Sequence, residues 1–187
     1  MSQILHVYSL DLAELQAVIG SEDEKLLNRI LARGRDHLLV TLPSEDQDGH
    51  VERNKDALRA ILAGGLFEEQ LAEHYVEALE LICDELASDG GDVQFRFGDK
   101  YLPFVIEDLA TSMMGEDPFP DTPGLAASIN AAEWNGWGHM SKKDCAEELE
   151  EYAGYTPDDP NDLGSWVVAW LRESKAADKD LIGFWGG

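Results

Sequence analysis

The chain has 187 residues, 44% of them hydrophobic, and its 38 acidic and 14 basic side chains give a formal net charge of −24. This length suffices for one substantial core, so the sequence predicts a single domain over residues 1–187. The charge repels nucleic-acid phosphates and anionic lipids, which argues against nucleic acid and membranes as partners and favours basic proteins.

The negative charge is concentrated in the middle of the chain. Residues 66–171 hold 24 acidic and 4 basic side chains, a net charge of −20, whereas residues 1–65 hold 11 and 7 and residues 172–187 hold 3 and 3. The opening residues lack a signal-peptide pattern, and no apolar stretch reaches the roughly 18 residues that span a bilayer. With two cysteines outside any C-x-x-C pair, we expect reduced thiols and a cytoplasmic location.

Three helices and two strands are expected in the first third of the chain. Asp11 and Ser21 each precede an acidic residue by three positions, which is the spacing of a helix start. Glycines, which commonly end helices, follow each helical pattern. The expected elements are a strand at 3–8, helices at 11–20, 21–34 and 51–63, a second strand at 37–41 and a polar loop at 43–50.

The longest periodic segment, residues 66–88, predicts one amphipathic helix. Its apolar residues recur every three or four positions and define a core-facing stripe of Leu71, Tyr75, Leu79, Ile82 and Leu86. Its carboxylates have the same spacing on a different face, with no Lys or Arg among them. This acidic stripe consists of Glu69, Glu73, Glu77, Glu80 and Asp84.

Like charges at this spacing repel each other, so the acidic stripe is expected to weaken the helix slightly. Replacing Glu73, Glu77 and Glu80 by Gln should then leave stability unchanged or slightly higher. A basic partner, in contrast, should associate more slowly with such a variant, because steering charges act mainly on the association rate.

The remaining segments complete an α+β fold that is mainly helical. The expected elements are a strand at 93–97, helices at 102–114, 141–151 and 165–177, a proline-rich loop at 115–124, an acidic loop at 155–164 and a strand at 181–185. Together they predict about seven helices and a small sheet of residues 3–8, 37–41, 93–97 and 181–185.

Residues 133–141, Glu-Trp-Asn-Gly-Trp-Gly-His-Met-Ser, predict a loop that leads into a helix capped by Ser141. The glycines permit tight turns, while the large rings can cover the edge of a core. One interpretation is a loop that seals the core. The other is an aromatic recognition loop in which Trp134, Trp137 and His139 bind a partner.

Catalytic signatures are weak in this sequence. Cys145 lies in the first turn of a helix near His139, a position that can activate a thiol. Its neighbours Asp144, Glu147 and Glu148 disfavour the thiolate, and no family-type cysteine motif surrounds it. We therefore expect no catalytic residue.

Metal signatures are equally weak. The acidic segments 45–50 and 158–164 depart from the calcium-loop pattern and are expected to be solvated turns. No H-x-x-x-H or HExxH pair occurs, so neither a zinc site nor a cofactor is expected. The histidines are His6, His37, His50, His74 and His139.

Two segments resemble a known group of proteins. HVYSLDLAELQAVIGSEDEKLLNRIL near the start and SWVVAWLRESKAADKDLIGFW near the end make up about a quarter of the chain. In their order of elements they resemble the YfbM-like bacterial domains of unknown function and the immunity proteins of polymorphic toxin systems. The resemblance implies a small bacterial α+β domain and transfers no functional residue.

The leading hypothesis is a non-enzymatic acidic binding protein, in particular an immunity-type inhibitor of a basic toxin or nuclease. The charge of residues 66–171 and the acidic stripe support it, since both would attract a cationic partner. One alternative is a small enzyme with a pocket near residues 133–145. Another is an acidic surface that serves only solubility or adaptation to salt.

Overall fold

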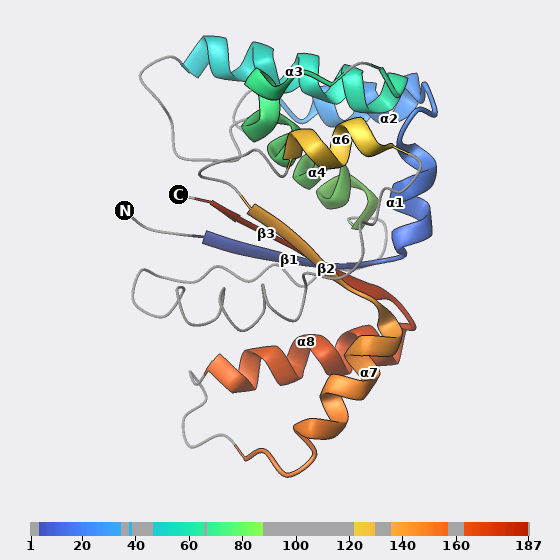
Figure 1. Cartoon of the computed structure of the whole chain (residues 1–187), viewed down its shortest axis with the longest axis vertical. Coiled ribbons are helices and arrows are strands. Elements are labelled where there is room, and N and C mark those ends of the chain that lie inside the picture. The colour runs from blue at the N-terminus through green and yellow to red at the C-terminus, as the bar shows by residue number, and fades with distance from the viewer. Residues whose placement is uncertain are drawn as a thin grey trace.

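The computed structural model describes residues 4–34, 38, 47–65, 67–87, 122–129, 136–156 and 163–186. These ranges form an α+β fold in which a three-stranded antiparallel sheet lies between two groups of helices (Figure 1). The elements are β1 (Ile4–Leu10), α1 (Leu12–Val18), α2 (Glu24–Ala32), α3 (Gln47–Ala63), the 3-10 helix η2 (Glu69–Leu71), α4 (Ala72–Ala87), α6 (Pro123–Ile129), β2 (Gly136–Met140), α7 (Lys142–Glu151), α8 (Leu163–Ala177) and β3 (Asp180–Gly186).

The sheet has the order β1-β3-β2, so β3 pairs with both other strands. Tyr8 and His139 are both paired with Ile182, which places these three side chains on the same face of the sheet. That face packs against the helices α1 to α4 and α6, where Tyr8 and Ile182 belong to the main core. The opposite face is covered by α7 and α8 (Figure 1).

Residues 136–140 form a strand, which corrects the expected loop at 133–141. Gly138 pairs with Gly183 of β3, while the neighbouring Trp137 and His139 pair with Phe184 and Ile182. Glycine usually marks a turn, but here Gly138 lies in a regular antiparallel ladder, where its lack of a side chain is tolerated. The alternation of small and large side chains was therefore a strand pattern.

Most helix predictions are confirmed within the described residues. The segment 66–88 contains η2 and α4, with Tyr75, Leu79 and Ile82 fully buried as expected. Helix α3 begins at Gln47, four residues before the expected start, so the predicted polar loop ends earlier. The expected strand at 93–97 and helix at 102–114 lie outside the described residues, as does the strand at 37–41 apart from Leu38.

Helix α6 differs from the prediction, since the sequence predicts a loop up to residue 124 and no helix directly after it. Pro123 is the first residue of this helix. Proline is favoured there because its fixed φ matches the helix and its missing amide hydrogen has no helical partner at that position. Leu125 and Ile129 of α6 are buried in the main core.

The side chain of Asp180 connects the start of β3 to two helices on different sides of the sheet. Its Oδ2 accepts a hydrogen bond from the Leu12 amide at the start of α1, at 2.8 Å. Its Oδ1 accepts one from the Lys142 amide at the start of α7, also at 2.8 Å. The first amides of a helix have no partner within the helix, so one carboxylate provides an acceptor for one such amide in each of the two helices.

Replacing Asp180 by Asn should destabilise the fold by about 1–3 kcal/mol, because an amide NH₂ would replace one of two acceptors that face backbone donors. Asp178→Asn is the matched control. It removes the same charge, but from a surface pair with Lys142, so little change is expected. Urea unfolding of both variants measures the difference in the free energy of unfolding. Equal midpoints would show that the hydrogen bonds of Asp180 to α1 and α7 do not stabilise the fold.

Candidate histidine-carboxylate site

The acidic stripe does not form one solvent-exposed surface, which corrects the sequence-based picture. Glu69 is exposed and Glu73 is partly buried, but Glu77 and Glu80 retain only 2% and 7% of their accessible surface. Asp84 is partly buried and forms an ion pair with Arg33 at the end of α2. Two of the five carboxylates are therefore inaccessible to a macromolecular partner.

The reason is that α4 is enclosed on several sides. It contacts α3, β1, α2 and α6 (Figure 1), so the face opposite the predicted apolar stripe is also covered. A buried carboxylate is costly unless it accepts hydrogen bonds from groups inside the protein. Glu77 and Glu80 each have such partners, and both sets include a histidine.

Glu77 lies at the centre of a buried polar cluster between α3 and α4. Its Oε2 accepts hydrogen bonds from His50 Nε2 and from Asn54 Nδ2, both at 2.6 Å. Asn54 also donates to the carbonyl of Leu38 at 2.8 Å, and its Oδ1 accepts from His74 Nδ1 at 2.6 Å. We refer to His50, Asn54, His74 and Glu77 as the α3–α4 cluster.

The hydrogen bonds determine which nitrogen of His74 carries the proton. Arg53 can only donate, and its Nε is 3.0 Å from His74 Nε2, so Nε2 is the acceptor and Nδ1 carries the hydrogen. Burial lowers the pKa of His74 to about 4, with the charges of His50 and Arg53 acting in the same direction and that of Glu77 against them. His74 is therefore neutral near neutral pH.

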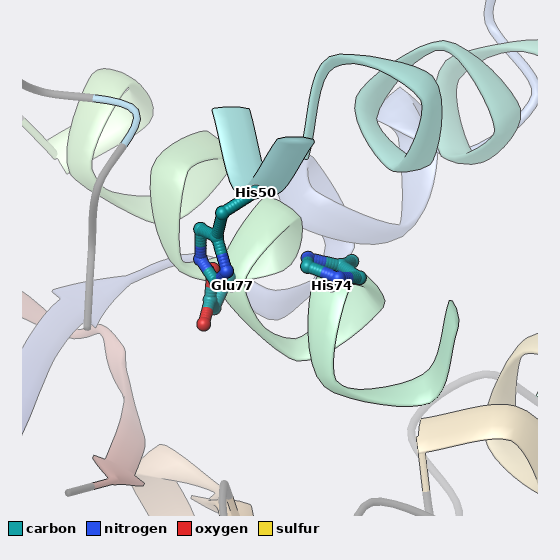
Figure 2. Close-up of side chains that lie close together, drawn as sticks. All are labelled: His50, His74 and Glu77. Atoms are coloured by element: carbon teal, nitrogen blue, oxygen red, sulfur yellow. The ribbon is translucent and has the colours of Figure 1, made fainter. Parts of the chain in front are cut away.

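Three members of this cluster have the side chains of a metal site. His50, His74 and Glu77 each place one potential ligand atom so that these atoms lie within 4.8 Å of one another. Figure 2 shows His74 directed toward His50 and Glu77, and the two imidazole rings are in edge contact with centroids 4.8 Å apart. The sequence-based expectation of scattered histidines missed this group.

One signal in the sequence could have revealed part of it. His74 and Glu77 are three residues apart, which places them on one face of a helix. His50 is distant in sequence and reaches them only because α3 packs along α4. Sequence spacing contains no information about that packing.

A second histidine-carboxylate pair lies one turn further along α4, on the side of the sheet. His6 Nδ1 of β1 donates to Glu80 Oε1, and the Tyr8 hydroxyl donates to the same oxygen at 3.3 Å. Burial raises the pKa of Glu80, and the hydrogen bond from His6 opposes this shift. The other ring nitrogen of His6, Nε2, is buried and has no hydrogen-bond partner among the described residues.

The aromatic residues proposed for recognition are only partly described. Trp137 is partly buried against the main core, and His139 is also partly buried, which lowers its pKa. Trp134 lies outside the described residues. A recognition role for these three residues therefore stays a prediction.

Cys145 is buried under β2, where its thiol donates to the carbonyl of Met140 at 3.7 Å. Burial raises the pKa of this thiol to about 11, although a hydrogen bond with Ser174 opposes the shift. The pKa of Cys83 is raised well above its usual range for the same reason. Neither thiol is a nucleophile at neutral pH.

Thiol labelling tests this conclusion. With Ellman's reagent at pH 8, both buried thiols should react many-fold more slowly in the folded protein than in denaturant, because reaction requires opening of the fold. Both should react fully once the chain is unfolded. A fast-reacting thiol in the folded protein would contradict the burial and restore Cys145 as a candidate nucleophile.

The role of Glu77 can be separated from charge repulsion along α4. Glu77→Gln should destabilise the protein by about 1–3 kcal/mol, because it removes charge-assisted hydrogen bonds to His50 and Asn54. The control Glu69→Gln, at an exposed position, should remain near wild type. Thermal unfolding with a chelator present provides the measurement. A more stable Glu77→Gln protein would show that repulsion dominates after all.

No helix in the described part of the chain is long and apolar enough to cross a membrane. The fold and the cluster define an α+β protein with a buried histidine-carboxylate network. The chain belongs to the family described as a domain of unknown function, DUF7691, whose model matches residues 1–186. No curated protein and no solved structure matches the chain.

Proposed function

We propose that this protein is an acidic binding protein whose partner is a basic protein. The observation that supports this is the net charge of −20 in residues 66–171, which is still −18 when the buried Glu77 and Glu80 are not counted. Two fewer carboxylates leave that segment strongly negative. Long-range attraction of a cationic surface depends on the summed charge and not on one stripe.

Helix α7 provides an exposed acidic surface among the described residues. Glu147, Glu150 and Glu151 are exposed on it, and Glu148 is partly buried beside them. Burial raises the pKa of Glu148, and the charge of Glu151 acts in the same direction. We define this α7 acidic face by Glu147, Glu148, Glu150 and Glu151.

The two lysines of α7 neutralise only one end of the helix. Lys142 pairs with Asp178 beyond the helix, and Lys143 lies 3.6 Å from Glu147. The last turn of α7 carries Glu150 and Glu151 and has no basic residue. Carboxylates at a helix C-terminus interact unfavourably with the helix dipole, so Glu150 and Glu151 lower the stability of α7. A role in binding explains their presence better than a role in helix stability does.

The finer proposal is an immunity-type inhibitor of a basic toxin or nuclease in the bacterial cytoplasm. It would bind its target through carboxylates and would not bind nucleic acid itself, because phosphates are repelled. The enzymatic alternative has less support, since Cys145 is protonated and buried.

The test compares two triple variants with equal charge changes. Glu147, Glu150 and Glu151 are replaced by Gln in one, and Glu14, Glu24 and Glu52, which are exposed on α1, α2 and α3, are replaced in the control. Partners are captured from the native host at low salt, and association rates of the captured basic protein are measured at two ionic strengths.

The α7 variant should associate several-fold more slowly and should show a flatter salt dependence, while the control should stay closer to wild type. Equal rates for both variants would move the binding surface away from α7. If no basic protein is captured at low salt, the acidity is adaptation for solubility and the proposed function is wrong.

A further inference from the structure

Beyond the proposed binding role, we propose that His50, His74 and Glu77 bind a divalent transition-metal ion of the zinc class. The three potential ligand atoms already lie within 4.8 Å of one another, between α3 and α4 (Figure 2). Two imidazoles and one carboxylate are a ligand set that Zn²⁺ commonly uses. Metal binding would then join the two helices through side chains of both.

The surroundings of His74 support this assignment independently. A histidine that ligates a metal usually donates its second ring N–H to a fixed acceptor, which sets the tautomer and the ring orientation. His74 donates from Nδ1 to Asn54 Oδ1 at 2.6 Å, and Asn54 is buried and held by the Leu38 carbonyl. The Nε2 lone pair of His74 is therefore oriented before any metal binds.

Arg53 occupies this lone pair in the structure. Its Nε donates to His74 Nε2 at 3.0 Å, and a metal ion at that nitrogen must displace it. Arg53 is an exposed residue, so its guanidinium can move aside without opening the core. Binding thus replaces the hydrogen bonds Arg53–His74 and His50–Glu77 by bonds from the same ligands to the metal. It also requires the proton on His50 Nε2 to leave or to move to Nδ1, because a nitrogen that binds a metal carries no hydrogen.

The ligand set also selects the kind of ion. Imidazole nitrogen favours Zn²⁺, Cu²⁺, Ni²⁺ and Fe²⁺ over Ca²⁺ and Mg²⁺, which prefer all-oxygen sites. The site is enclosed: Glu77 and His74 retain 2% and 8% of their accessible surface, and the His50 side chain 14%. His50 is therefore the ligand nearest to solvent, on the side from which an ion would enter.

The first measurement uses chain without a histidine tag, treated with chelator and then titrated with Zn²⁺ by calorimetry. We expect about one equivalent to bind and the melting temperature to rise, since a metal that binds only the folded state stabilises it. Co²⁺ serves as a spectroscopic probe, because its visible bands report nitrogen and oxygen ligands in a tetrahedral or similar site. Ca²⁺ and Mg²⁺ should produce neither effect.

Two variants of opposite expected effect identify the site. His50→Gln should weaken Zn²⁺ binding at least tenfold, because it removes one ligand at a position that tolerates change near solvent. Arg53→Ala should strengthen binding several-fold, because it removes the competing hydrogen bond and a nearby positive charge. His139→Gln is the matched control, a partly buried histidine outside the cluster, and should bind like wild type.

The proposal is overturned if the wild-type chain does not bind Zn²⁺, if Arg53→Ala leaves the affinity unchanged, or if His139→Gln lowers it as much as His50→Gln. The Arg53 variant keeps all three ligands, so it remains informative even if His50→Gln folds poorly. Failure of this test does not affect the binding role proposed for the α7 acidic face, since none of the residues of that face belongs to the α3–α4 cluster.

Discussion

The enclosure of α4 is the constraint on which much of the structure depends. A helix that contacts α3, β1, α2 and α6 has little surface left for solvent, yet its sequence contains several carboxylates. Each buried carboxylate needs hydrogen-bond donors inside the protein, because desolvation of a charge without them is prohibitive. The fold provides donors from neighbouring elements: His50 and Asn54 of α3 for Glu77, and His6 and Tyr8 of β1 for Glu80.

The hydrogen bonds of Glu77 and Glu80 also determine the orientation of α4 within the main core. Because Glu77 faces α3 and Glu80 faces β1, the rotation of α4 about its axis is fixed by polar contacts on two sides, in addition to the packing of Tyr75, Leu79 and Ile82. Apolar packing alone tolerates some adjustment of a helix, whereas hydrogen bonds require particular distances and directions. The network therefore contributes more to the uniqueness of the arrangement than to its net stability.

Local signals in the sequence predicted where helices begin and end, but not which of their side chains are buried or which strands pair. The Ser141 cap and the end of α7 at Glu151 follow from side chains within one turn of each helix end, so sequence spacing was sufficient. The burial of Glu77 depends on α3 lying alongside, and the pairing of Gly138 with Gly183 depends on strands that are far apart in the chain. An acidic stripe with helical spacing looks the same in sequence whether solvent or a histidine-bearing helix faces it.

The size of a possible ligand separates the two proposed functional features of the protein. A macromolecular partner can reach only carboxylates on the surface, and those of α7 are exposed while Glu77 is not. A metal ion is small enough to reach Glu77 beside His50, the ligand nearest to solvent, and there it would meet one negative charge and the neutral imidazole of His74. Acidic residues of this chain thus fall into two groups with different chemistry. In the proposed roles, those on the surface attract a partner through long-range charge, whereas Glu77 binds a metal ion through the directed contacts of a buried site.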